Sequence, residues 1–271
     1  MRREELPTLL DAMWQDYLKI NPDARVIHQL FADRNPTLIN DHIALRTFDY
    51  PKVGIRALAK PFVDAGYIPK GEYYFPAKKL FAEHFEHPDS TLPKIFISEL
   101  HVNQLSENAQ QIIDRCISEL PSKAVTEDHF CYSGRHWNIS YEEYQQLLQE
   151  SEYAAWLCAF GFRPNHFTLL INALQSHRSV ESVNTFLQEQ GFELNQAGGL
   201  VKGSPDEFLE QSSTLAKPIL VPFSDCNIEI PGCYYEFARR YPLANGPLYQ
   251  GFVTTSADKI FESTDVHRSN G

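Results

Sequence analysis

The sequence lacks several features that would assign it to a specialised class of protein. Its 271 residues carry a formal net charge of −11 at pH 7, so the excess of positive charge that neutralises nucleic-acid phosphates is absent. No segment approaches the ~20 consecutive apolar residues that cross a bilayer. The N-terminal segment has acidic residues where a signal peptide has an apolar run. We therefore expect a cytoplasmic protein with no nucleic-acid partner and no membrane partner.

Cysteine is scarce, its odd number favours free thiols over a disulfide framework, and its spacing excludes a Cys-x-x-Cys metal or redox motif. The five cysteines are odd in number, and no two of them form such a motif. We expect free thiols in a reducing compartment. With 43% hydrophobic and 22% charged residues, the composition is that of an ordinary globular protein. The chain is long enough for one large domain or for two similar modules.

Helical and strand-like patterns alternate along the chain in an order that indicates an α+β protein. Residues 4–33 carry apolar residues at helical spacing with an interruption at Pro22, which predicts N-terminal helices. The segments 106–120 and 140–160 each predict a helix, and together they form a helical insert at about 106–160. Strand-like segments precede and follow the insert. We expect a single domain that spans residues 1–271.

An internal repeat relates the segments on either side of this insert. The stretch NDHIALRTF (40–48) has a counterpart in PNHFTLLIN (164–172), and each places a histidine before an apolar strand. Downstream, FVDAGY (62–67) and FLQEQGF (186–192) each end a helical pattern at a glycine followed by an aromatic residue. We interpret the copies as two modules, about 36–105 and 160–265, that face one another. The alternative is chance similarity between short apolar strings.

The polar face of the first repeated strand carries residue types that suit a binding site. Side chains alternate along a strand, so His42, Ala44 and Arg46 share one face. Related modules bring equivalent positions together, and we expect His42 and His166 to converge on one metal ion. In an acidic protein, Arg46 can supply the local attraction for an anionic ligand, because its planar guanidinium binds a carboxylate through two hydrogen bonds.

Glu236 is the candidate for a third metal ligand. It lies in the aromatic, strand-forming stretch CYYEFARRYP, where a buried carboxylate costs several kcal/mol unless it is paired. Metal coordination would supply the partner, and the alternative is an ion pair with Arg239 or Arg240. Two histidines and one carboxylate leave positions open for substrate, as in non-haem Fe(II) oxygenases. Zn²⁺ accepts the same donors and would support hydrolytic or isomerase chemistry.

Three other polar residues are weaker candidates. Strand alternation places Asp41 on the face opposite His42. Glu99, in the stretch FISEL, is a candidate hydrogen-bond acceptor behind the metal ligands. His84 lies in the polar stretch AEHFEHP, for which we expect solvent exposure rather than metal ligation.

Several stretches, taken together, resemble one known family. The chain, from about residue 5 to 265, resembles a compact form of the 2-oxoadipate dioxygenase/decarboxylase (D-2-hydroxyglutarate synthase) family, within the vicinal oxygen chelate superfamily. The most specific parts are the His-x3-Arg strand and the Glu-Phe-Ala-Arg stretch. The resemblance implies paired βαβββ modules that form a curved mixed sheet around a metal pocket. The stretches that carry it are HIALR, FPAKKL, PKIFISEL, NHFTLLIN, YYEFARR and GFVTTSADKIFESTD.

The resemblance also implies a site and a reaction. Fe(II) would be held by His42, His166 and Glu236, while His42 and Arg46 would contact the substrate, with Arg46 in a catalytic role. The implied partners are a small 2-oxo acid and O₂, and the implied reaction converts 2-oxoadipate to 2-hydroxyglutarate and CO₂. Two alternatives stay open. One is a Zn²⁺- or Mn²⁺-dependent hydrolase or isomerase of the same fold, and the other is a protein that binds an acidic ligand without turnover.

Overall fold

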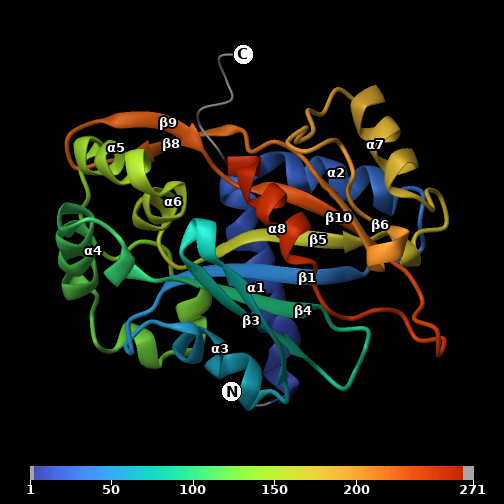
Figure 1. Ribbon diagram of the computed structural model, residues 1–271, viewed down its shortest axis with the longest axis horizontal. Coiled ribbons are helices and arrows are strands. Elements are labelled where there is room, and N and C mark those ends of the chain that lie inside the picture. Colours follow the sequence, from blue (N-terminus) through green and yellow to red (C-terminus); the bar gives the residue numbers. More distant parts are fainter. Residues whose placement is uncertain (1–2, 265–271) are drawn as a thin grey trace.

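The structure is a computed structural model, and it describes residues 3–264. Within this range, eight strands form one large mixed sheet, two more form a hairpin, and helices pack around them (Figure 1). The helices are α1 (Leu6–Ile20), α2 (Pro22–Ala32), α3 (Ile55–Asp64), α4 (Glu107–Glu119), α5 (Tyr141–Glu150), α6 (Glu152–Phe160), α7 (Val180–Glu189) and α8 (Thr254–Phe261). The strands are β1 (Asn40–Phe48), β2 (Ile68–Phe75), β3 (Leu80–Glu86), β4 (Lys94–Leu100), β5 (Pro164–Leu170), β6 (Lys202–Ser204), β7 (Leu209–Ser213), β8 (Pro218–Pro222), β9 (Asn227–Pro231) and β10 (Tyr234–Arg240). No helix in this range is long and apolar enough to span a membrane.

The large sheet consists of two halves with the same strand pattern. Its order is β2-β3-β4-β1-β5-β10-β7-β6. β1 runs parallel to β4 and β5 runs parallel to β10, while β1 and β5 pair antiparallel at the centre. In each half a helix, α3 or α7, follows the central strand, and three further strands complete a βαβββ unit. The expected α+β class with paired βαβββ modules is confirmed. The expected end of the second module, at 265, lies just outside the described residues.

The N-terminal helix α1 covers one face of the sheet at its centre. The ring of Trp14 contacts Phe167 of β5, with ring centroids 5.0 Å apart, and Tyr235 of β10, at 5.9 Å. Phe167 and Tyr235 are partners in the strand register. Because side chains alternate along a strand, His166 and Glu236 project from the opposite face. The packing of α1 therefore fixes which side chains point towards the candidate site.

Helix α8 covers the opposite face, where it contacts both edge strands, β2 and β6, as well as β7. A helix of eight residues is only ~12 Å long. The two edges of the sheet must therefore approach each other around α8, which means that the sheet is strongly curled. In Figure 1, α8 (red) lies in front of β5 and β10.

The predicted helix at 140–160 is two helices, so this prediction is wrong in part. α5 ends at Glu150 and α6 begins at Glu152, because Ser151 between them has extended backbone (φ −150°, ψ 105°). The Ser151 hydroxyl accepts a hydrogen bond from the backbone N–H of Ala154 and so caps the new helix. As a result, Glu152 lies in the first turn of α6, where it reaches Arg46 of β1.

Two further features complete the fold. Strands β8 and β9 form a separate hairpin that packs at the start of α5, where the backbone N–H of Tyr141 donates to the Asp225 carboxylate (Figure 1). The five cysteines form no disulfide, and four of them are buried. The expectation of free thiols is therefore confirmed.

Candidate metal centre

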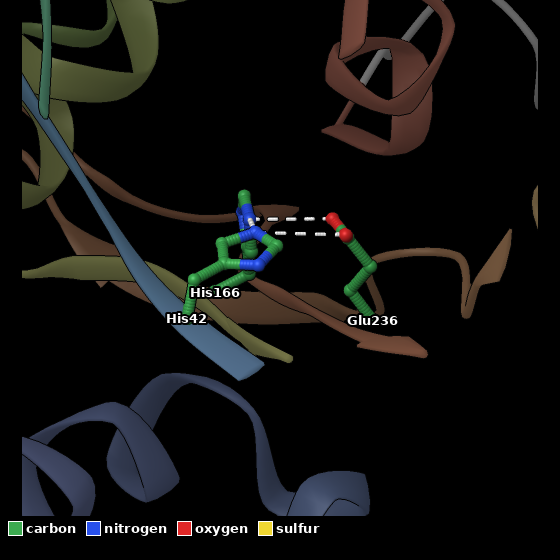
Figure 2. A group of neighbouring side chains, drawn as sticks. All are labelled: His42, His166 and Glu236. Carbon is green, nitrogen blue, oxygen red and sulfur yellow. Dashed lines mark hydrogen bonds and ion pairs between the residues drawn. The ribbon is translucent and has the colours of Figure 1, made fainter. Parts of the chain in front are cut away.

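Three buried side chains converge on the sheet face beneath α8 (Figure 2). His42 comes from β1, His166 from β5 and Glu236 from β10, which are neighbouring strands. The two Nε2 atoms lie 3.2 Å apart. The Glu236 carboxylate oxygens lie 3.6 Å from Nε2 of His42 and 3.3 Å from Nε2 of His166. The structure thus brings the three predicted ligands together, and their role as metal ligands stays a prediction.

Strand register explains why these residues meet. His42 pairs with Thr168 of β5, and Thr168 pairs with Glu236 of β10, so the three form one row across the sheet. His166 lies in the next row, opposite Ala44. The small Ala44 side chain leaves room for the imidazole to lean towards the first row.

A small cavity of about 20 Å³ adjoins the three side chains. This volume holds roughly one water molecule. Helix α8 forms much of the wall, so a ligand of several carbon atoms needs α8 or its side chains to move. Besides the three candidate ligands, the wall consists of Phe96, Gln211 and Phe252 and, from α8, of Ala257, Ile260 and Phe261.

Burial sets the protonation of the three candidate ligands. It lowers the pKa of His42, and it lowers the pKa of His166 well below the ordinary value, with His42 and Arg46 adding to the effect. Burial raises the pKa of Glu236 to about 8, although Gln211 donates a 2.5 Å hydrogen bond to its Oε1 atom. Near neutral pH both imidazoles are therefore uncharged, and without a cation the carboxyl group keeps its proton.

The donor set fits a divalent cation. Nδ1 of His42 lies 2.9 Å from Asp41 Oδ1 and Nδ1 of His166 lies 3.2 Å from Asn165 Oδ1, so each Nδ1 carries the hydrogen and each Nε2 presents a lone pair. These lone pairs face each other beside Glu236, whose Oε2 has no hydrogen-bond partner among the described residues. A cation relieves the repulsion between such donors. Donors held at ~2.1 Å and at right angles lie roughly 3 Å apart, close to the distances found.

Asp41 lies on the same side as His42, so the prediction that it points to the opposite face is wrong. Its carboxylate accepts from Nδ1 of His42 and from Nε and Nη2 of Arg240, the last two at 2.6 and 2.8 Å. The physical reason is a register shift in β1 between Asn40 and His42. Asp41 is the extra residue of this β-bulge, and a bulge breaks the alternation of side chains.

Glu236 forms no ion pair with an arginine within the described part of the chain, so the alternative interpretation of this residue is wrong. The guanidinium of Arg240 is paired with Asp41. The guanidinium of Arg239 lies over the ring of Tyr241, at 4.9 Å. The buried carboxyl group of Glu236 is instead surrounded by the two histidines and the Gln211 amide.

Arg46 is buried among aromatic rings and one carboxylate. Its Nη1 lies 3.3 Å from Glu152 Oε1 and its Nη2 lies 3.3 Å from the Thr264 hydroxyl. Its Nε atom has no hydrogen-bond partner among the described residues. The guanidinium carbon is 5.0 Å from the Trp156 ring and 5.9 Å from that of Phe261. Phe261 also lines the cavity beside the candidate ligands, so its ring lies between Arg46 and that cavity.

Two of the weaker candidates lie elsewhere than expected. His84 is buried, and its nitrogens lie 2.9 Å from the Tyr73 hydroxyl and 2.9 Å from a Glu86 carboxylate oxygen. The expectation of solvent exposure is therefore wrong, because Tyr73 and Glu86 enclose the ring. Glu99 accepts a hydrogen bond from the backbone N–H of Ile55 at the start of α3. It thus stabilises a helix terminus and does not stand behind the candidate ligands.

Three residues near the candidate ligands were missed by the sequence analysis. The Thr168 hydroxyl lies 3.1 Å from Nε2 of His42, and Gln211 donates to Glu236. The Tyr234 ring stacks on that of His166, with centroids 4.7 Å apart, and its buried hydroxyl has no partner among the described residues. Two signals could have found them. The segment 210–214 is a polar run in a strand, and Tyr234 precedes Glu236 by two positions, hence on the same face.

Comparison with known proteins identifies the family. A family model described as 2-oxoadipate dioxygenase/decarboxylase matches residues 4–127 and 122–247. The chain belongs to this family. A curated member, the chloroplastic/amyloplastic 2-oxoadipate dioxygenase/decarboxylase of Oryza sativa subsp. japonica, is 38% identical over 95% of this chain and 78% of that protein. The family resemblance inferred from the sequence is therefore confirmed.

Solved structures support the same family and its fold. The hydroxyglutarate synthase of Oryza sativa, in complex with 2-oxoadipate, is 37% identical with a TM-score of 0.90, covering 98% of this chain and 94% of that one. A protein from Shewanella frigidimarina, named provisionally as a hydrolase, is 53% identical with a TM-score of 0.89, covering 92% and 97%. A glyoxalase superfamily protein from Ralstonia eutropha is 19% identical with a TM-score of 0.73, covering 90% and 84%, and shows the fold alone.

The raised pKa of Glu236 predicts that this residue destabilises the metal-free protein. The carboxyl pKa is about 8 in the fold against an ordinary value of 4.5, so the unfolded chain releases the proton first and stability falls as pH rises from about 4.5 to 8. We expect metal-free Glu236→Gln to exceed the metal-free wild type by up to roughly 3 kcal/mol in unfolding free energy at pH 7, and by little near pH 4.5.

Urea denaturation at several pH values measures this difference. Added divalent metal should stabilise the wild type more than Glu236→Gln, because the amide is a poorer ligand than a carboxylate. If the difference between the two proteins is the same at pH 4.5 and at pH 7, the buried, protonated carboxyl is ruled out.

Proposed function

We propose that this member of the 2-oxoadipate dioxygenase/decarboxylase family is an Fe(II)-dependent enzyme that converts 2-oxoadipate and O₂ to 2-hydroxyglutarate and CO₂. The observation that carries the proposal is the convergence of His42, His166 and Glu236 on one point of a closed, buried sheet face. The family supplies the reaction, and the donor set supplies the reason for iron. Two imidazoles and one carboxylate on one side of the metal leave positions open for substrate and O₂.

The reaction balances without a second organic substrate. Carbon 1 of 2-oxoadipate leaves as CO₂. Carbon 2 becomes a new carboxylate that takes up one oxygen atom of O₂, and carbon 3 takes up the other as a hydroxyl group, which gives 2-hydroxyglutarate. Bound iron would supply the activation of O₂ and the site to which the 2-oxo acid group binds. The protein has to orient a short dicarboxylate and to exclude water.

Arg46 is the proposed anchor for the distal carboxylate of the substrate. Its side chain is 1% exposed and fixed, whereas the side chain of Glu152, its present partner, is 24% exposed and can turn towards solvent. A substrate carboxylate can therefore replace Glu152 without leaving the buried guanidinium unpaired. Such a planar, two-point contact suits arginine.

Tyr234 is a second proposed contact for the substrate. Its ring stacks on His166, and the charges of Arg46 and Glu236 both act on its hydroxyl group. Burial raises the pKa of this hydroxyl well above its ordinary value, so it remains a hydrogen-bond donor at all working pH values. Buried polar groups without partners are rare in folded proteins. A carboxylate held between the metal and Arg46 would provide the missing acceptor.

Substrate entry requires a change in the covering helix. The cavity of about 20 Å³ beside the candidate ligands is far smaller than a six-carbon dicarboxylate. Phe261 of α8 lines this cavity and also faces Arg46. Displacement of α8, or rotation of the Phe261 ring, would join the two halves of the proposed binding site.

The alternative function is that of a Zn²⁺- or Mn²⁺-dependent hydrolase of the same fold. The provisional name of the Shewanella frigidimarina protein, at 53% identity, favours keeping this alternative. It differs from the proposed function in two measurable respects, which are the metal bound after anaerobic purification and the consumption of O₂.

Oxygen uptake by the anaerobically purified, Fe(II)-loaded protein tests the proposal. We expect uptake of one O₂ per 2-oxoadipate, with release of one CO₂ and formation of 2-hydroxyglutarate. His166→Ala should retain the fold but lose iron, since one of three ligands is removed. Stoichiometric iron without O₂ uptake on any 2-oxo acid would refute the oxygenase, and activity restored by Zn²⁺ on a hydrolysable substrate would establish the alternative.

Substitution of Arg46 should affect dicarboxylic substrates selectively. We expect Arg46→Ala to lower kcat/KM for 2-oxoadipate, and the loss should correspond to about 2–4 kcal/mol of transition-state stabilisation. The variant should retain iron and slow activity on monocarboxylic 2-oxo acids. Arg46→Lys should recover only part, because an ammonium group cannot match two oxygens. In contrast, Glu152→Gln should lower KM for the dicarboxylate, because it removes the competing carboxylate. Equal losses for both substrate classes would reduce Arg46 to a structural residue.

Two neighbouring tyrosines provide a matched test of the Tyr234 contact. The hydroxyl groups of Tyr234 and Tyr235 are both buried without a hydrogen-bond partner among the described residues, but they lie on opposite faces of β10. Tyr234→Phe should reduce kcat/KM for 2-oxoadipate by roughly 10-fold or more, the value of a hydrogen bond to a charged group. Tyr235→Phe should have no effect on kinetics, and both variants should melt at similar temperatures. Matching kinetics in the two variants would exclude Tyr234 from the substrate site.

A further inference from the structure

The two central strands carry β-bulges at equivalent places. In β1 the register shifts between Asn40 and His42, which leaves Asp41 as the extra residue. In β5 the register passes from His166 to Pro164 against consecutive residues of β1, which leaves Asn165 as the extra residue. Each bulge therefore lies immediately before a candidate histidine ligand, and each holds a residue with a short side chain that ends in an oxygen.

The bulges bring each side-chain oxygen to the histidine that follows it. Neighbouring side chains of a regular strand point to opposite faces, and a bulge re-aims one of them. The resulting distances are 2.9 Å from Asp41 Oδ1 to Nδ1 of His42 and 3.2 Å from Asn165 Oδ1 to Nδ1 of His166. Asp41 and Asn165 are 3% and 1% exposed, so water does not compete for these contacts.

We propose that Asp41 and Asn165 are positioning residues for the metal centre, one from each module. Each accepts the hydrogen on Nδ1, fixes the tautomer and ring orientation of its histidine, and leaves the Nε2 lone pair for the metal. Hydrogen-bond partners behind the ligands commonly have this role. The proposal rests on the proposed function, because it requires that a metal binds to His42, His166 and Glu236.

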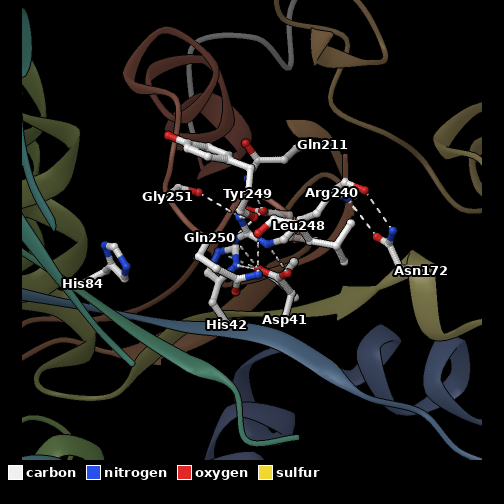
Figure 3. Close-up of polar contacts among 12 residues, drawn as sticks. Asp41, His42, His84, Asn172, Gln211, Arg240, Leu248, Tyr249, Gln250 and Gly251 are labelled. Carbon is white, nitrogen blue, oxygen red and sulfur yellow. Dashed lines mark hydrogen bonds and ion pairs between the residues drawn. The ribbon is translucent and has the colours of Figure 1, made fainter. Parts of the chain in front are cut away.

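The two positioning residues differ in charge and in their own support. Arg240 donates two hydrogen bonds to the Asp41 carboxylate, and its Nη1 donates to the backbone carbonyls of Tyr249 and Gly251, at 3.0 and 2.8 Å. Figure 3 shows this network around His42. In contrast, the Nδ2 atom of Asn165 has no hydrogen-bond partner among the described residues. The first positioning group is thus a fixed anion and the second is a neutral amide.

Arg240 also connects Asp41 to the cover of the site. The residue after Gly251 is Phe252, whose ring lies 4.8 Å from that of His42. One arginine therefore holds both the carboxylate behind His42 and the backbone that brings an aromatic ring over it. Because Asp41 carries a fixed charge and is held by two hydrogen bonds from Arg240, we expect it to matter more for metal affinity than Asn165.

Metal affinity of the purified chain tests the proposal without any assay of activity. Co²⁺ is titrated into metal-free wild type, Asp41→Asn and Asn165→Ala in competition with a chromophoric chelator. We expect dissociation constants weakened 10- to 100-fold for Asp41→Asn and up to about 10-fold for Asn165→Ala. The Co²⁺ absorption spectrum should change in both variants, because the ligand rings are no longer held at their original angles.

Asp49→Asn is the matched control. Asp41 lies near the start of β1 and Asp49 directly follows its end. The Asp49 carboxylate likewise lies near a histidine, 3.3 Å from Nδ1 of His101, which is not a candidate ligand. This variant should bind Co²⁺ as the wild type does. Asn165→Asp should bind at least as tightly as the wild type, since it supplies a stronger acceptor.

The outcomes distinguish a failure of the proposed function from a failure of the positioning role. Absence of Co²⁺ binding to the wild type would overturn the proposed function itself. Wild-type binding with unchanged affinity and spectrum in both Asp41→Asn and Asn165→Ala would overturn only the positioning role. Should Asp41→Asn fail to fold because Arg240 loses its counter-ion, Asn165→Ala decides alone, since it leaves no buried charge behind.

Discussion

The antiparallel pairing of β1 with β5 is the contact on which the rest of the structure depends. It joins the two βαβββ units into one sheet, and its register places His42 beside Thr168 and Ala44 beside His166. The two histidines whose Nε2 atoms lie 3.2 Å apart, His42 and His166, come one from each unit. β10 then adds Glu236 by parallel pairing with β5. The candidate metal centre is thus a property of the junction between the units and not of either unit.

This junction holds polar groups that are expensive to bury, and the surrounding core explains how they are tolerated. On the far side of the sheet, aromatic rings of α1, β5 and β10 pack together and provide apolar burial at roughly 25 cal/mol per Å². On the near side, Arg240 neutralises Asp41, and the backbone carbonyls of Tyr249 and Gly251 accept its remaining hydrogen bonds. The repulsion between the facing lone pairs of the candidate ligands is left, and a bound cation would relieve it.

The sequence permits prediction of the candidate ligands because they combine a repeat with an anomaly. Two histidines recur at equivalent positions of similar strands, and Glu236 is a carboxylate in an aromatic strand. The residues behind them could not be predicted in the same way. The placement of Asp41 follows from a bulge, and bulges depend on pairing with a strand more than 120 residues away. The Arg240–Asp41 pair joins residues 199 positions apart. The division between α5 and α6 depends on a single capping serine within an otherwise continuous helical pattern.

The bulges at Asp41 and Asn165 also constrain how the sequence can change over time. Asp41 and Asn165 are the extra residues of their bulges, so removing either one would restore regular pairing and leave the pairs on both sides of it in register. A one-residue deletion in the regularly paired part of β1 or β5 would instead shift one flank by one position and turn ligands or core residues away from their partners. A substitution at Asp41 or Asn165 keeps the register and alters only the contacts of that side chain. Each strand can therefore lose or exchange its bulge residue and forfeit only that side chain's contacts, whereas other changes in length would disrupt the junction.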